Sequence, residues 1–194
     1  MRVEFLEWRD AAWQPAAAMI EAHFLQTHGA VITVPDVRLA VARSATGVIL
    51  GAAGMRDAAR GFFSQIYLDD PVDQVLTRLS GSPVGPEEVI EVVSMACPHP
   101  SATLPLIEAV TAEGRGSGKC WGLFTATGPL MRLLRRTGVP LLPLTPARPD
   151  RLPDAARWGR YYQTEPWVCA LQDSMQPLRF MPRRGQPLTG ARPE

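Results

Sequence analysis

The chain has 194 residues, 46% of them hydrophobic, and its 20 basic and 19 acidic residues leave a formal net charge of +1. These values are typical of one globular domain with a sizeable core, and the balanced charge gives no sign of a nucleic-acid partner. The N-terminus lacks the apolar core of a signal peptide and no apolar run is long enough to span a bilayer, so we expect a cytoplasmic protein without stable membrane insertion.

Hydrophobic patterning divides the first half of the chain into short strands and helices. It predicts a strand over residues 3–8, a helix over 15–28, two strands over 37–43 and 47–56, and a helix over 71–79. The connection between the two middle strands is short and contains Gly47, which favours a β-hairpin.

The most informative segment is an apolar, β-branched run over residues 89–96, which predicts a buried strand. Glu91 interrupts this run, and an ionised carboxylate is costly to bury unless it is paired or hydrogen-bonded. Ser94 adds a second polar group, and the strand ends at residues 97–100, where two prolines cannot continue the ladder. Because ligand sites in α/β folds gather at strand ends, we expect the working centre within residues 91–103.

The second half of the chain continues the alternation of helices and strands. It predicts helices over 101–113 and 127–138, strands over 120–126, 158–162 and 165–171, and an irregular stretch over 141–153. The glycine-rich residues 114–119 lack the spacing of a phosphate-binding loop and join a helix to a strand, so they are interpreted as a connector. We expect one domain over residues 1–172 and a flexible Pro/Arg-rich tail over 173–194.

The three cysteines, Cys97, Cys120 and Cys169, show no CxxC spacing. They therefore indicate neither a zinc site nor a disulfide framework, and we expect reduced, buried thiols and no metal site.

Three arginines share one face of the helix predicted over 127–138. Arg132, Arg135 and Arg136 stand at i, i+3 and i+4 spacing. Such a face is either a solvated basic surface or a docking patch for an acidic partner, and the pattern leaves both interpretations open.

Four segments occur in the order and spacing of the thermostable hemolysin family, which the chain resembles over roughly residues 15–171. They are FFSQIYLDDPVD (62–73), IEVVSMA (90–96), LFTAT (123–127) and WGRYY (158–162). The succession of elements also resembles the GNAT acyltransferase fold, and the order of Arg56, a helix and the Glu91 strand is similar to that of acyl-homoserine-lactone synthases. One departure is Val93-Ser94-Met95, where the family has Gly-Asn-Leu.

This resemblance implies a GNAT-like α/β (α+β) fold, with a mixed, mostly antiparallel central sheet flanked by helices and splayed between strands 89–96 and 120–126. An acyl-pantetheine arm lies in the gap of such a sheet. In most GNAT enzymes a glycine-rich loop at a helix N-terminus binds the coenzyme A pyrophosphate. The corresponding residues 97–103 contain no glycine and two prolines. This departure favours the phosphopantetheine arm of an acidic acyl carrier protein as donor, with acyl-CoA as the alternative and no permanently bound cofactor.

The implied reaction is the attack of an amine on a thioester. Glu91 is predicted to be the general base or, alternatively, a structural carboxylate paired with an arginine such as Arg56. Backbone N–H groups near Ser94 are predicted to stabilise the oxyanion, and Tyr161 or Tyr162 to protonate the leaving thiolate.

The predicted site residues fall into three groups. The catalytic group is Glu91, Ser94, Tyr162 and Cys97, the last as an alternative nucleophile with His99 as its base. The donor-binding group is Met95, Ala96, His99, Thr125, Thr127, Arg132, Arg135 and Arg136. The acceptor-binding group is Arg56, Phe63, Tyr67, Trp158 and Tyr161.

The sequence thus predicts an N-acyltransferase that moves an acyl group from a carrier protein to a small-molecule amine in a biosynthetic pathway. The alternatives are an enzyme that uses acyl-CoA, a non-catalytic protein that binds an acyl carrier or lipid, and a membrane-lytic protein.

Overall fold

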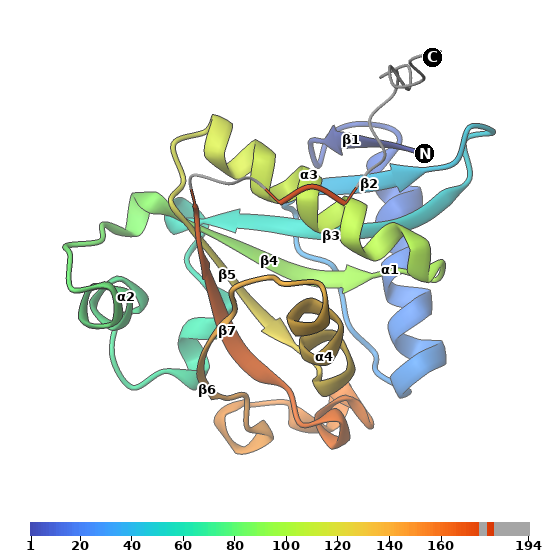
Figure 1. Ribbon diagram of the computed structural model, residues 1–194. Helices are drawn as coiled ribbons and strands as arrows, with labels where there is room; N and C mark the ends of the chain where they lie inside the picture. Colours follow the sequence, from blue (N-terminus) through green and yellow to red (C-terminus); the bar gives the residue numbers. More distant parts are fainter. Residues whose placement is uncertain (175–177, 181–194) are drawn as a thin grey trace, which may run out of the picture.

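A computed structural model describes residues 1–174 and 178–180, and within them the chain forms one seven-stranded sheet (Figure 1). The strands are β1 (Arg2–Leu6), β2 (Arg38–Arg43), β3 (Ile49–Asp57), β4 (Val89–Ala96), β5 (Trp121–Ala126), β6 (Leu142–Pro146) and β7 (Trp167–Gln172). Their order is β1-β2-β3-β4-β5-β7-β6. Only the β4–β5 pair of this described sheet is parallel.

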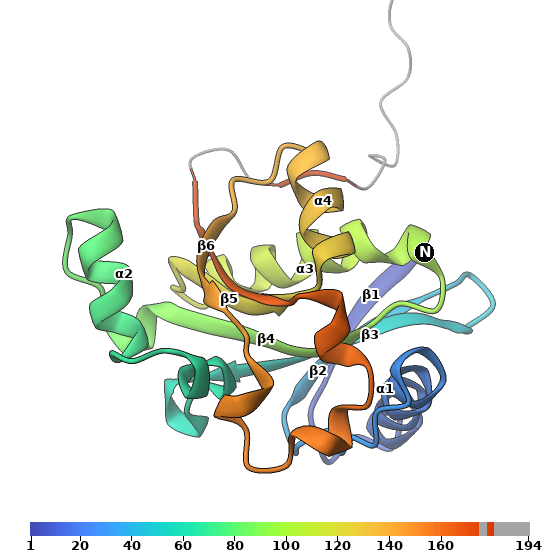
Figure 2. The same cartoon turned by 90° about the horizontal axis from the view of Figure 1, so that it is seen from below.

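Helices cover both faces of the sheet (Figure 2). The α-helices are α1 (Trp13–His28), α2 (Val72–Ser80), α3 (Thr103–Gly116) and α4 (Gly128–Arg136). Short 3₁₀ segments are η1 (Ala58–Arg60), η2 (Phe63–Tyr67), η3 (Pro86–Glu88), η4 (Pro100–Ala102), η5 (Pro149–Arg151), η6 (Ala155–Trp158) and η7 (Tyr161–Thr164). In Figure 2, α3 and α4 lie on one side of the sheet and α1 on the other.

The alternation of side chains along β2 explains why both faces are apolar. Leu39 and Val41 pack in the cluster that contains α1, whereas Ala40 and Ala42 pack in the cluster that contains α3. All four are fully buried. Because successive residues of a strand point to opposite faces, an unbroken apolar run is what a sheet covered on both sides requires.

The parallel strands β4 and β5 separate partway along their length. They are paired only from Val89 with Trp121 to Val92 with Phe124. Beyond this point β4 continues its pairing with β3, and β5 continues with β7. The backbone edges of β4 and β5 that face each other after Val92 and Phe124 therefore form no ladder between them, and a gap opens in the sheet.

A bulge in β4 lies beside this gap. Residues 52–54 of β3 face residues 93–96 of β4, so β4 carries one extra residue. Ser94 has φ +50°, a left-handed conformation that a non-glycine residue rarely adopts. Such a residue costs roughly 1–3 kcal/mol and persists only where its surroundings fix it, which marks this position as a candidate functional site.

The predicted fold class, a mixed and mostly antiparallel sheet splayed between residues 89–96 and 120–126, is confirmed. Two local predictions were wrong. The stretch 141–153, expected to be irregular, contains the edge strand β6, where prolines are tolerated because one side of the strand is unpaired. The strand expected over 158–162 is instead the end of η6 and the start of η7.

Three further expectations concern the thiols, the tail and the membrane. The three thiols were expected to be buried, but only Cys169 is buried, while Cys97 is partly buried and Cys120 is exposed just before β5. Asp173, the first residue of the predicted tail, forms an ion pair with Arg115, and most of that tail lies outside the described residues. Among the described helices, none has the length and apolar character needed to cross a membrane.

Candidate active site

A cavity of about 680 Å³ occupies the gap between β4 and β5 and extends to both faces of the sheet. On the side of α1 its wall includes Phe24, Trp158 and Tyr161, and on the side of α3 and α4 it includes Leu106 and Leu130. The cavity is large enough for a drug-sized ligand. Since it passes through the sheet where the two strands separate, one ligand can reach both faces.

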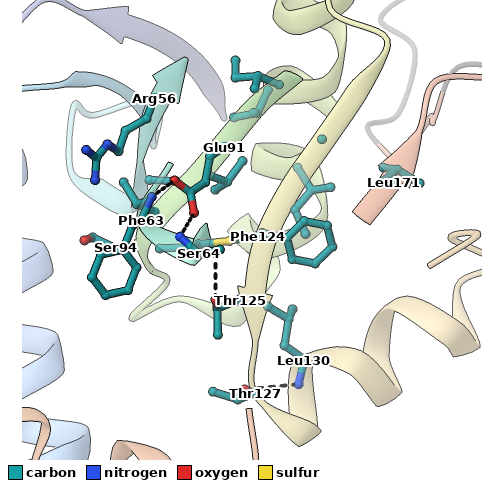
Figure 3. A pocket seen from close by; sticks show the side chains of 18 of the residues that line it. Arg56, Phe63, Ser64, Glu91, Ser94, Phe124, Thr125, Thr127, Leu130 and Leu171 are labelled. Carbon is teal, nitrogen blue, oxygen red and sulfur yellow. Dashed lines mark hydrogen bonds between the residues drawn. The ribbon is translucent and has the colours of Figure 1, made fainter. Parts of the chain in front are cut away.

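Glu91 lies one residue before the last pair of the β4–β5 ladder, at the closed end of the gap (Figure 3). Its side chain is fully buried and accepts hydrogen bonds from the backbone N–H groups of Phe63 (2.6 Å) and Ser64 (2.7 Å). Burial raises the pKa of Glu91, while hydrogen bonds from Ser64 and Phe63 and the charge of Arg56 offset part of that rise. A carboxyl group in this environment can take up a proton near neutral pH more readily than an exposed one.

Ser64 links Glu91 to the far side of the gap, and it was not among the site residues predicted from the sequence. Its buried hydroxyl lies 3.2 Å from the hydroxyl of Thr125 on β5 and also hydrogen-bonds to Glu91. Figure 3 shows this chain of contacts from β4 across to β5. The sequence carried only an indirect signal for Ser64, because a glutamate buried in a strand requires hydrogen-bond donors from another part of the chain.

Arg56 does not pair with Glu91, although it lies directly opposite Glu91 in the β3–β4 ladder. Its Nη2 donates instead to the backbone carbonyl of Arg60 at 2.6 Å. Among the described residues Arg56 forms no ion pair, and its buried Nε has no hydrogen-bond partner. The predicted Arg56–Glu91 ion pair is therefore not formed. The buried carboxylate instead accepts hydrogen bonds from two backbone N–H groups of η2.

Six aromatic rings line the cavity on the face of α1, and we call them the aromatic branch. They are Phe24, Phe63, Tyr67, Trp158, Tyr161 and Tyr162. The hydroxyls of Tyr67 and Tyr162 lie 2.5 Å apart. Burial, and for Tyr162 also the hydrogen bond with Tyr67, raise the pKa of both phenols, so both are neutral at neutral pH and one donates to the other.

Aliphatic side chains line the cavity on the opposite face, and we call them the aliphatic branch. They are Ile90, Val92, Leu106, Ile107, Val110, Leu130, Leu134 and Leu171. Gly122 also lines the cavity next to Leu171, and because it has no side chain it leaves space beside this branch. In Figure 3, Phe124 and Leu130 lie across β5 from Glu91 and Ser64. This branch suits an apolar chain.

The structure brings eleven of the predicted site residues to the cavity wall. They are Arg56, Phe63, Tyr67, Glu91, Ser94, Met95, Thr125, Thr127, Trp158, Tyr161 and Tyr162. Thr127 is also the N-cap of α4, since its hydroxyl accepts from the backbone N–H of Leu130 at 3.5 Å.

The other predicted residues lie outside the cavity wall. Ala96 is buried in the cluster that contains α1, and Arg132, Arg135 and Arg136 are exposed on α4. Cys97 packs among the residues beneath α3, where burial raises the pKa of its thiol, and its hydrogen-bond partner is Thr103. His99 is exposed. The structure therefore does not place a Cys97–His99 pair in the cavity.

Two histidines of α1 also line the cavity, although the sequence indicated no role for them. Burial lowers the pKa of His23 and His28, so both are neutral at neutral pH. The ring of His28 lies 5.3 Å from that of Tyr161. Over the described part of the chain, no group of three metal-binding side chains comes together.

Comparison with solved structures finds the same fold in several proteins. TofI in an apo form is 18% identical, with a TM-score of 0.59 over 92% of this chain and 94% of that one. BjaI, a CoA-dependent acyl-homoserine lactone synthase solved with MTA, is 13% identical, with a TM-score of 0.58 over 91% and 85%. FeeM, an N-acyl amino acid synthase from uncultured soil microbes, is 14% identical, with a TM-score of 0.57 over 89% and 95%.

The splayed sheet and these neighbours define the class of the fold, which is GNAT-like. The family is shown by sequence, because the family model described as Thermostable hemolysin matches residues 6–175. The chain therefore belongs to the thermostable hemolysin family. No curated protein sequence matches the chain.

Proposed function

We propose that this protein is an N-acyltransferase that moves an acyl group from a pantetheine thioester to a small-molecule amine. The observation that carries the proposal is the gap between β4 and β5, which has unpaired strand edges on both sides and Glu91 at its apex. An extended pantetheine arm carries amide groups that can pair with such edges as an added strand does. Two neighbours of the same fold are named as acyl-homoserine lactone and N-acyl amino acid synthases.

The two branches of the cavity supply the two substrate sites. The acyl chain of the donor fits the aliphatic branch, because transfer of its methylene groups from water into an apolar wall is favourable. The amine fits the aromatic branch on the face of Glu91. The thioester carbon then lies in the gap, between the two.

Glu91 is the proposed general base. It takes a proton from the amine, the amine nitrogen forms a bond to the thioester carbon, and the carbon–sulfur bond breaks. Backbone N–H groups at the bulge around Ser94 are the proposed donors to the oxyanion. The proton removed from the amine finally reaches the thiolate, and neutral Tyr162 stabilises the sulfur by a hydrogen bond.

The connection after β4 supports a carrier protein as the donor. Within residues 97–103, two prolines lack an N–H group. The N–H of His99 donates to the carbonyl of Leu50, that of Ala102 to the carbonyl of His99, and that of Thr103 to the carbonyl of Pro100. Few donors remain for a pyrophosphate. The phosphopantetheine of a carrier protein has a single phosphate, and the exposed Arg132, Arg135 and Arg136 would face an acidic carrier.

The test is thiol release from acylated carrier protein and from acyl-CoA, each mixed with a pool of small amines, with the amide product identified by mass spectrometry. We expect amide formation that depends on the protein and is faster from the carrier. Transfer from acyl-CoA alone would keep the reaction and overturn the choice of donor. Absence of transfer from both donors, with short and long acyl chains, would overturn the proposed function.

A further inference from the structure

Arg56 offers a positive charge and an unused donor to whatever occupies the aromatic branch. Its place opposite Glu91 in the antiparallel ladder puts both side chains on the face of α1, and both line the cavity. The buried Nε has no partner among the described residues, and no described carboxylate forms an ion pair with the guanidinium. A buried donor without a partner is costly, so an anionic oxygen of a ligand would be bound strongly there.

The six rings of the aromatic branch form a continuous wall next to Glu91. Phe63, whose N–H donates to Glu91, lies with its ring 5.8 Å from that of Trp158. Trp158 lies 5.3 Å from Tyr161 and 6.0 Å from Tyr162. Centroid distances in this range are those at which rings stack or meet edge to face, and an additional ring of a ligand gains the same contacts.

We propose that the amine acceptor is an α-amino acid with an aromatic side chain. Its carboxylate binds Arg56, its amine lies at Glu91, and its ring packs in the aromatic branch. The inference rests on the proposed function and adds the class of acceptor. An α-amino acid fits because its carboxylate is attached to the carbon that bears the reacting nitrogen. This spacing matches an arginine and a glutamate that are direct neighbours across β3 and β4.

The choice between ligands follows from what each would leave unpaired. A decarboxylated amine such as phenethylamine would leave the Nε of Arg56 without an acceptor, and sites built to bind a polar group reject analogues that lack it. Glycine would pair with Arg56 but leave the rings exposed to water. Phenylalanine or tyrosine satisfies both.

The experiment compares kcat/KM for phenylalanine and for phenethylamine with the same acyl donor. In the wild type we expect phenylalanine to be favoured by about tenfold to a hundredfold, the range for a charge-assisted hydrogen bond. Arg56→Gln should bring the ratio close to one, chiefly through the KM for phenylalanine. Arg60→Gln is the matched control, because the exposed side chain of Arg60 is outside the cavity wall and only its carbonyl contacts Arg56.

The same comparison without a donor separates this inference from the proposed function. Calorimetric titration should show that phenylalanine binds the wild type and Arg60→Gln more tightly than it binds Arg56→Gln. Equal rates and equal binding for phenylalanine and phenethylamine would overturn the inference, and so would a preference for leucine or S-adenosylmethionine over phenylalanine. Selective binding of phenylalanine without transfer to any amine would overturn the proposed function and keep the amino-acid site.

Discussion

The two branches of the cavity lie back to back on opposite faces of one sheet, and they differ in chemistry. Beside the six rings of the aromatic branch, the cavity is lined by two neutral histidines, Arg56 and Glu91, whereas the aliphatic branch consists of eight leucine, isoleucine and valine side chains. Both meet in the gap between β4 and β5.

The difference originates within three consecutive residues of β4. Ile90 and Val92 point to the face of α3, and Glu91 between them points to the opposite face. One strand can therefore contribute apolar side chains to one site and a carboxylate to another. This requires that the neighbouring strand, here β5, diverges and leaves room for a ligand between the two faces. If the two branches act separately, a substitution in one should leave the substrate preference of the other unchanged.

The largest expected effect is on the carboxylate of the aromatic branch. Glu91→Gln should lower kcat/KM by about 10²- to 10⁴-fold, the usual contribution of a general base. Because burial raises the pKa of Glu91, the wild-type rate should increase with pH through a midpoint above that of an ordinary glutamate, and the variant should lose this limb. Steady-state rates across a pH series measure both.

The control is Glu87→Gln, a substitution of an exposed glutamate just before the same strand.

The pH dependence of stability gives an independent check of the raised pKa of Glu91. The folded state holds the proton of Glu91 more tightly than the unfolded state, so the free energy of unfolding should fall as pH rises from the unfolded pKa through the folded one. An unchanged pH–rate profile in Glu91→Gln would contradict the role of this residue as base.

The next largest effect is expected between η6 and η7, where Gly159 separates Trp158 from Tyr161 and Tyr162 of the aromatic branch. Gly159 has φ +52°, and a Cβ atom there would lie 2.3 Å from the carbonyl oxygen of His28. Gly159→Ala should therefore displace Trp158 and Tyr161 and cost about 1–3 kcal/mol from backbone strain alone. For a chain of this size each kcal/mol lowers the melting temperature by about 2–4 °C.

Calorimetric melting and the rate with a short acyl donor measure the two consequences of Gly159→Ala. Gly116→Ala, at a helix position where a Cβ meets nothing within 4 Å, is the matched control. Wild-type stability and rate in Gly159→Ala would show that the close approach to α1 is not needed.

A smaller effect is expected in the aliphatic branch. At Gly122 an added Cβ would make only ordinary contacts, 3.8 Å from the carbonyl oxygen of Leu171, so a larger residue can be accommodated without backbone strain. Gly122→Val should fill the space beside the aliphatic branch and favour donors with shorter acyl chains. The ratio of kcat/KM values should change by about tenfold or more per methylene.

Competition between donors of different chain length measures this shift. The ratio of rates for phenylalanine and phenethylamine should stay as in the wild type if the two branches act separately. A change in acceptor preference with no change in chain-length preference would reverse our assignment of the branches.

The smallest effect is expected outside the cavity, on α4. Arg135→Glu should slow transfer from an acidic carrier protein by up to about tenfold at low salt, with a smaller difference at high salt, because electrostatic steering is screened. Transfer from acyl-CoA should change less, and Arg148→Glu, at an exposed arginine outside α4, is the control. Equal slowing with both donors would contradict a carrier-specific patch.

Several elements could be predicted from local sequence. The boundaries of β4 followed from an apolar run that ends before two prolines, and α4 followed from Thr127 and Pro129 at its start. Such signals act over a few residues, so they persist wherever the segment is placed. The strand expected over 158–162 failed for the opposite reason, since η6 and η7 are held by hydrogen bonds from Val31 and to His28, which lie far away in sequence.

The sequence by itself determined that a charged residue lies in a buried strand and that a chain of alternating strands and helices resembles an acyltransferase fold. Only the tertiary structure decided that Glu91 accepts hydrogen bonds from the N–H groups of Phe63 and Ser64, that the Nε of Arg56 has no partner among the described residues, and that six rings from three segments form one wall. Hydrophobic patterning is a local property of the chain. The partners of a buried polar group are set by which distant backbone segments the packed core brings within hydrogen-bonding distance.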